Sequence, residues 1–119
     1  MLALSPFCRY YLYRGATDFR KGFDGLSGLV RSELGKDPVQ GEVFIFLNGK
    51  RTQVKLLHFE GDGFSLYHKR LEQGTYELPR SAASQPSVPM SSQELMLLLQ
   101  GIKLESVQRR KRYCHKKSS

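Results

Sequence analysis

The sequence predicts a small α+β domain in which an antiparallel sheet of about four or five strands packs with two helices. Residues 42–70 carry apolar, β-branched and aromatic runs that are separated by two turn signals, which is typical of consecutive antiparallel strands. Residues 23–34 and 91–102 instead have apolar residues at helical spacing. A chain of 119 residues is long enough for one such domain, and no second domain is expected.

The run at residues 43–47 predicts a strand that is covered on both faces. Asn48-Gly49 suits a two-residue type I′ turn, and this turn would place Leu47 opposite Lys50 and Val43 opposite Val54. The resulting hairpin has an aliphatic face, predicted to be the core side. Its other face combines aromatic with basic and amide side chains: Phe44, Phe46, Arg51, Gln53 and Lys55. That face either stacks on bases and contacts phosphates, or lies under a helix; the sequence leaves both interpretations open.

Three further strands are predicted, over residues 8–14, 64–70 and 75–78, the last ending at Pro79. In the first, Tyr11 and Tyr13 share one face. The turn before residues 64–70 is either a two-residue Asp62-Gly63 loop or a three-residue loop that includes Gly61. These alternatives turn Leu66 to opposite faces, so the orientation of that strand stays open.

Each predicted helix has boundary signals. Gly35 suits the residue that follows the helix at 23–34, and Ser91 with Glu94 forms a capping box for the second helix. Residues 79–90, rich in Pro and Ser, predict a linker between the sheet and that helix. Two surfaces are candidates for contact with a partner. The first is formed by the glycines at 22, 25 and 28, whose spacing predicts close packing by the sheet or by another protein. The second is formed by Met96 and Leu97, which fall outside the apolar face of the second helix.

Residues 1–104 are therefore predicted to form the domain, and residues 105–119 a basic tail that is disordered in isolation. The formal charge is +8, and residues 106–117 contain six Lys or Arg and no acid. Two cysteines, Cys8 and Cys114, are too few for a disulfide framework and are expected to be free thiols. The first residues lack the features of a signal peptide, so the protein is expected in the cytoplasm, without a membrane span.

No catalytic constellation is found. Asp18 precedes the first helix and suits an N-cap, and the neighbouring Arg20 and Lys21 make this turn either an anion-binding corner or an ordinary loop. The acidic residues Asp24, Glu60 and Asp62 do not predict a pair of carboxylates that would bind a divalent metal ion. No CxxC or HxxxH spacing supports a zinc site. The sequence predicts neither an enzyme nor a bound cofactor or metal.

Three segments, residues 11–30, 43–79 and 91–102, resemble the TnpB or Orf2-like accessory proteins of IS66-type bacterial insertion sequences. The most specific motif positions are Thr17, Asp18, Gly22, Phe23, Asp24, Gly61, Asp62 and Gly63. Phe19 stands where the family usually has Met. The resemblance implies a small protein needed for efficient transposition, while a separate transposase carries the strand-transfer site; it supplies no established catalytic residues.

A non-catalytic accessory factor that associates with DNA, with the transposase of the same element, or with both is therefore expected. The candidate phosphate contacts are Arg20, Lys21, Lys50, Arg51, Lys69, Arg70, Arg109, Arg110, Lys111 and Arg112, and the candidate stacking residues are Tyr11, Tyr13 and Phe44. The alternative is a protein-interaction module that regulates the transposase without touching DNA.

Overall fold

The computed structural model describes residues 4–78 and 85–100 and contains five strands and two helices in these ranges. In chain order they are β1 (Tyr10–Ala16), α1 (Phe23–Ser32), β2 (Val43–Leu47), β3 (Gln53–Phe59), β4 (Phe64–Arg70), β5 (Ser87–Met90) and α2 (Ser92–Leu99). The strands form one sheet in the order β4-β3-β2-β1-β5. This confirms the predicted α+β class with two helices.

The sheet is mixed, whereas an antiparallel sheet was predicted. The β2/β3 and β3/β4 pairs are antiparallel, but β1 runs parallel to β2, with Tyr10 beside Val43 and Leu12 beside Ile45. The segment between these two strands contains α1 and carries the chain back to the end of the sheet where β1 began. A return of this kind produces a parallel pair, while a tight turn produces an antiparallel one.

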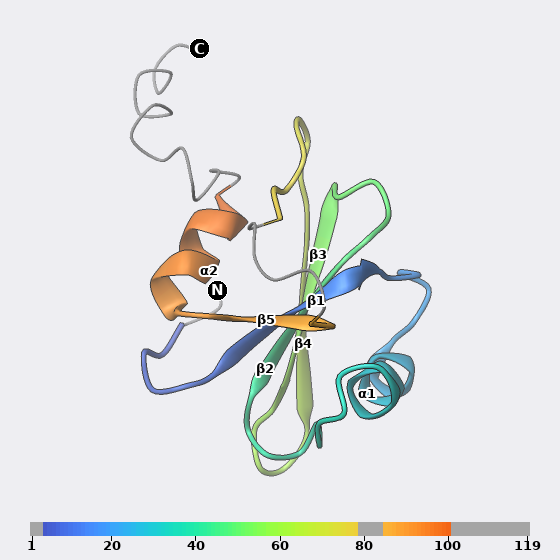
Figure 1. Cartoon of the computed structure of the whole chain (residues 1–119), viewed down its shortest axis with the longest axis vertical. Coiled ribbons are helices and arrows are strands. Elements are labelled where there is room, and N and C mark those ends of the chain that lie inside the picture. The colour runs from blue at the N-terminus through green and yellow to red at the C-terminus, as the bar shows by residue number, and fades with distance from the viewer. Residues whose placement is uncertain (1–3, 79–84, 101–119) are drawn as a thin grey trace.

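The two helices lie on opposite faces of the sheet (Figure 1). On one face, Leu95 and Leu98 of α2 join the aliphatic side chains of β2 and β3 in a common core. On the other, Leu26 and Val30 of α1 pack with the aromatic side chains of β2. All five residues of β2 are consequently buried, as its uninterrupted apolar sequence indicates.

The loop between β2 and β3 is longer than the predicted two-residue turn. Val43 pairs with His58, not with Val54, and residues 48–52 lie between the strands. The Asn48 side chain organises this loop: its Oδ1 accepts hydrogen bonds from the backbone N–H groups of Thr52 and Gln53 at 2.8 and 2.9 Å. Because the partner of Val43 moves by four residues, an even number, the two hairpin faces keep the side chains predicted for them.

Replacing Asn48 with Ala should lower the free energy of unfolding by about 2 kcal/mol, because two half-buried N–H groups lose their acceptor. Urea denaturation of the full chain measures this. Asn48→Asp is the matched control, since it keeps the acceptor oxygen and loses only the amide donor that reaches Thr52 Oγ1 at 3.1 Å. A loss in the Asp variant equal to that in the Ala variant would show that the acceptor does not organise the loop.

The β3/β4 turn resolves the open orientation of β4. Glu60 donates its N–H to the Gly63 carbonyl at 2.8 Å, so Gly61 and Asp62 form the loop, and Gly61 adopts a φ of +97°. The loop has two residues, as in one of the predicted alternatives, but begins one residue earlier. Leu66 faces the α1 core and Tyr67 the α2 core.

Two predictions for residues 75–90 were wrong. Residues 75–78 form no strand, although Tyr76 is fully buried and donates its N–H to the Arg51 carbonyl at 2.7 Å. Residues 87–90, predicted to be linker, form β5 and pair antiparallel with β1. Its proline, Pro89, is tolerated because β5 is an edge strand and needs no N–H on its outer side. Residues 79–84 of the predicted linker lie outside the described residues.

The start of α2 agrees with its sequence signal, while α1 ends at Ser32, two residues earlier than predicted. The Ser91 hydroxyl accepts the Glu94 N–H at 3.0 Å, and the Glu94 carboxylate accepts the Ser91 N–H at 2.9 Å, which confirms the capping box. Gly35 has the left-handed conformation predicted for it, with a φ of +65°, but it lies three residues after Ser32 and does not directly follow α1. In the part of the chain that the structure describes, no helix has the length and apolar character needed to cross a membrane.

Candidate nucleic-acid interface

The described part of the chain is almost neutral. It contains eleven Lys or Arg and ten Asp or Glu, a net charge of +1, although the whole chain carries +8. The remaining residues contribute eight Lys or Arg and one Glu, mostly after residue 100. The charge that would attract a polyanion is therefore carried mainly by the C-terminal sequence, and Arg109 to Arg112 lie outside the described residues.

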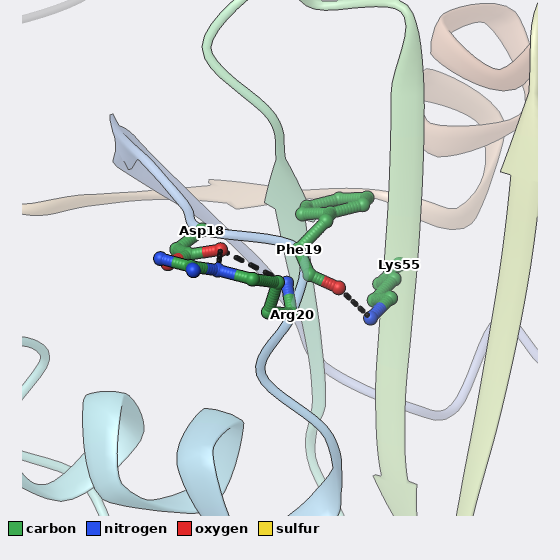
Figure 2. Close-up of polar contacts among 4 residues, drawn as sticks. All are labelled: Asp18, Phe19, Arg20 and Lys55. Carbon is green, nitrogen blue, oxygen red and sulfur yellow. Dashed lines mark hydrogen bonds and ion pairs between the residues drawn. The ribbon is translucent and has the colours of Figure 1, made fainter.

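Lys55 holds the loop that joins β1 to α1. It lies in the central strand β3, is only 7% exposed, and donates from Nζ to the carbonyl oxygens of Phe19 and Lys21 at 2.9 Å each (Figure 2 shows the first of these bonds). The same ammonium lies 4.9 Å from the centre of the Phe19 ring, within reach of a cation–π interaction. One buried charge thus fixes the position of a loop that carries two exposed cations.

Asp18 does not cap α1, in contrast to the prediction. The N-cap is Gly22, which makes no side-chain cap hydrogen bond, and Asp18 instead binds Arg20. Its Oδ1 accepts the Arg20 N–H at 3.0 Å, and its carboxylate accepts the Arg20 guanidinium, with a shortest distance of 2.7 Å (Figure 2). The hydrogen bonds from Arg20 lower the pKa of Asp18 to about 2, so this carboxylate is charged at neutral pH.

The Asp18 pair leaves Arg20 a weaker anion ligand than an isolated arginine. The guanidinium is 92% exposed but already faces a carboxylate, so a phosphate would have to compete with Asp18. Lys21 is exposed and uses its backbone for contacts with Lys55 and Asp18. Of the two basic residues in this predicted anion-binding corner, Lys21 therefore has the side chain that is less committed.

The other candidate cations of the folded domain are scattered. Lys69 donates from Nζ to the Leu99 carbonyl at 3.1 Å and so ties β4 to the last turn of α2. Arg70 lies 3.5 Å from a Glu72 carboxylate oxygen, with both side chains well exposed. Lys50 and Arg51 are exposed in the β2/β3 loop. Two of these four cations, Lys69 and Arg70, therefore already have a polar partner among the described residues.

Of the predicted stacking residues, Phe44 is covered by α1, while Tyr11 and Tyr13 are half-buried and pack against other side chains. Phe44 is fully buried under α1, so it cannot stack on a base. Tyr11 stacks on Phe44 with ring centres 6.0 Å apart, and the Lys36 ammonium lies 4.1 Å from the Tyr11 ring centre. The ring centres of Tyr13 and Phe46 are 6.2 Å apart. Of the two interpretations of this face, the one in which a helix covers the aromatic rings is correct.

The structural role of Lys55, which holds the loop between β1 and α1, was not predicted from the sequence. Lys55 was placed among the polar groups of the aromatic face, opposite Glu42, and its partner in β2 is in fact Phe46. The only signal in the sequence is a single charge between Val54 and Leu56, inside an apolar strand. Such a residue needs hydrogen-bond partners when it is buried, but the sequence does not say that they come from residues 19 and 21.

The motif positions fall into two structural groups. Thr17 is buried and donates its N–H to the Leu47 carbonyl at 2.9 Å, which ties the start of the loop to β2. Gly22, Phe23 and Asp24 begin α1 with exposed side chains or none, while residues 61–63 form the β3/β4 turn. Among the described residues, no group of three His, Cys, Asp or Glu is arranged to hold a metal ion.

Comparison with known proteins assigns this chain to a family. Residues 8–109 match the model of the family described as "IS66 Orf2 like protein", which covers most of the sequence and both motif groups. The chain belongs to the IS66 Orf2-like family. No solved structure matches it.

Two relatives of this IS66 Orf2-like protein come from Sinorhizobium fredii (strain NBRC 101917 / NGR234). One, "Uncharacterized protein y4jC", is 33% identical over 93 residues, which is 78% of each chain. The other, "Uncharacterized protein y4hO", is 31% identical over 102 residues, 86% of this chain and 87% of its own. The matches cover more than three quarters of each relative's own length.

The IS66 Orf2-like domain also leaves two surfaces open among the described residues. A Cβ placed on Gly22 or Gly28 would meet no atom within 4 Å, so the sheet does not pack against these glycines, contrary to one of the two predictions for them. Phe23 beside them is 46% exposed, and Met96 on α2 is 49% exposed. These apolar groups are available to a partner protein.

Proposed function

We propose that this protein is a non-catalytic accessory factor of insertion-sequence transposition, which binds DNA through its basic C-terminal residues and works in the cytoplasm beside the transposase of the same element. The family supports the connection with transposition. The observation that carries the DNA contact is the separation of charge: a nearly neutral folded domain is followed by a sequence with almost all of the excess positive charge. Clustered Lys and Arg of this kind bind phosphate backbones with little dependence on base sequence.

The non-catalytic part of the proposal is consistent with the contacts of the acidic motif residues. Asp18 is engaged by Arg20, and Asp62 occupies a two-residue turn. Phosphoryl transfer by metal ions needs carboxylates that converge on one site. These two have local structural roles that explain their presence without catalysis.

A gel-shift series with the full chain tests the DNA contact. Duplexes with the terminal repeat of the element and with random sequence should both bind at low salt, with similar affinities. The affinity should fall steeply as salt rises, because each phosphate contact contributes about 0.9 to the slope of log affinity against log salt. Absence of binding at low salt would remove DNA from the proposed function.

A second candidate function, a protein-interaction module that regulates the transposase, is favoured by the open glycine side of α1 and by exposed Met96. Co-purification with the transposase separates the two candidates. An association that survives nuclease treatment of the lysate supports direct protein contact. An association that disappears on nuclease treatment indicates that DNA bridges the two proteins.

A further inference from the structure

An open groove of about 350 Å³ lies beside the Lys55 site and is lined by Gln53, His68, Arg70 and Glu72. Gln53 and Arg70 are opposite each other across β3 and β4. His68 Nε2 and Gln53 Oε1 are 2.7 Å apart, and because an amide oxygen only accepts, Nε2 is the donor. The Gln53 amide nitrogen is then left as a donor in the groove that Arg70 also lines.

A buried positive charge neighbours the groove, since Lys55 is paired with the groove residue His68 across β3 and β4. Among the described residues, no ion pair compensates the Lys55 ammonium; its partners are two main-chain carbonyls and an aromatic ring. The Phe19 ring connects this ammonium to the groove, since it meets the His68 ring edge-on at 5.5 Å. Burial and the charges of Lys55 and Arg70 lower the pKa of His68, which indicates a positive potential in the groove.

One acidic side chain opposes this potential. Glu72 lines the groove, and its carboxylate lies 3.5 Å from the Arg70 guanidinium. The two side chains are 69% and 83% exposed, and an exposed pair of this kind contributes at most about 1 kcal/mol. A phosphate group, which offers more acceptor oxygens than a carboxylate, can therefore displace Glu72 from Arg70.

We propose that this groove binds a phosphate group of the DNA backbone. The Arg70 guanidinium and the Gln53 amide are its hydrogen-bond donors, and the buried ammonium of the neighbouring Lys55 supplies attraction without direct contact. His68 holds the Gln53 amide in place and is a positioning residue. The inference rests on the proposed function and adds a contact on the folded domain, which orients the domain on a duplex that the C-terminal residues attract.

Opposite charge changes on the two sides of the groove give the sharpest test. In the full chain, Arg70→Gln should weaken binding to a short random duplex roughly eightfold at about 0.1 M salt, the effect of one lost phosphate contact. Glu72→Gln should strengthen it roughly two- to fivefold, because Arg70 loses its competitor. Arg31→Gln and Glu33→Gln make the same charge changes at exposed positions in the last turn of α1 and at its C-cap. Effects of the groove variants that equal those of these controls would overturn the proposal.

Nuclear magnetic resonance titrations distinguish the source of the phosphate. Inorganic phosphate and the duplex should each shift the Gln53 side-chain amide and the Arg70 Nε–H, while chloride at equal ionic strength should not. A duplex that binds without shifting these groups overturns the groove and leaves the proposed function standing. Shifts with inorganic phosphate, without any duplex binding at low salt, overturn the DNA assignment of the groove and also remove DNA from the proposed function. No shift with either ligand overturns the groove as a phosphate site.

Discussion

Replacing Arg109, Arg110, Lys111 and Arg112 with Gln should lower the affinity of the full chain for random duplex DNA by on the order of a thousandfold at about 0.1 M salt. Each cation that neutralises one phosphate contributes about 0.9 to the slope of log affinity against log salt, so four lost contacts flatten that slope by roughly three and a half. Fluorescence anisotropy over a salt series measures both quantities. The effect is large because residues 4–78 and 85–100 together are nearly neutral, so they add little general attraction for DNA.

A matched control uses four exposed cations of the folded domain, changed together to Gln: Arg9, Arg31, Lys50 and Arg51. The net charge falls by the same amount, so any general electrostatic attraction falls equally in both variants. The control should retain most of its affinity, since these residues lie in three different parts of the fold: before β1, in α1 and in the β2/β3 loop. If it loses as much affinity as the first variant, the domain surface carries the DNA contacts and the assignment to the C-terminal residues is wrong.

The elements that could be predicted from the sequence are those with local causes. The buried strand β2 is an unbroken apolar run, and α2 begins at a capping box whose two hydrogen bonds lie within four residues. The class of the fold follows from these segments. The basic C-terminal sequence is visible for the same reason, since a block of like charges needs no tertiary structure to be recognised.

The features that were missed depend on contacts between distant parts of the chain. The parallel pairing of β1 with β2 depends on the path of the whole connection through α1, and β5 is a strand because an edge of β1 is available to it. The Lys55 contact joins residues that are 34 and 36 positions apart. The failed prediction of a type I′ turn between β2 and β3 has a local cause. The Asn48 side chain accepts hydrogen bonds from the backbone of a longer loop, and these bonds favour that loop over the two-residue turn.

Phe44→Ala should lower the free energy of unfolding by about 3 to 5 kcal/mol, because it removes a fully buried ring and leaves a cavity under α1. That is a large part of the stability of a small domain, so the variant should be partly unfolded near body temperature. Urea denaturation measures the loss. Phe7→Ala is the control, since Phe7 is 94% exposed and its replacement should change stability by less than about 0.5 kcal/mol.

Phe44→Leu separates burial from base stacking at the same position. Leucine keeps most of the apolar volume, so the variant should fold, but it has no ring with which to stack. A ring that stacks on a base contributes about 1 to 3 kcal/mol to single-strand binding, whereas a ring inside the core contributes nothing to it directly. Single-stranded and duplex DNA should therefore bind the folded Phe44→Leu protein as tightly as they bind the unchanged chain. A selective loss of single-strand affinity would mean that α1 moves away and exposes the ring in the complex.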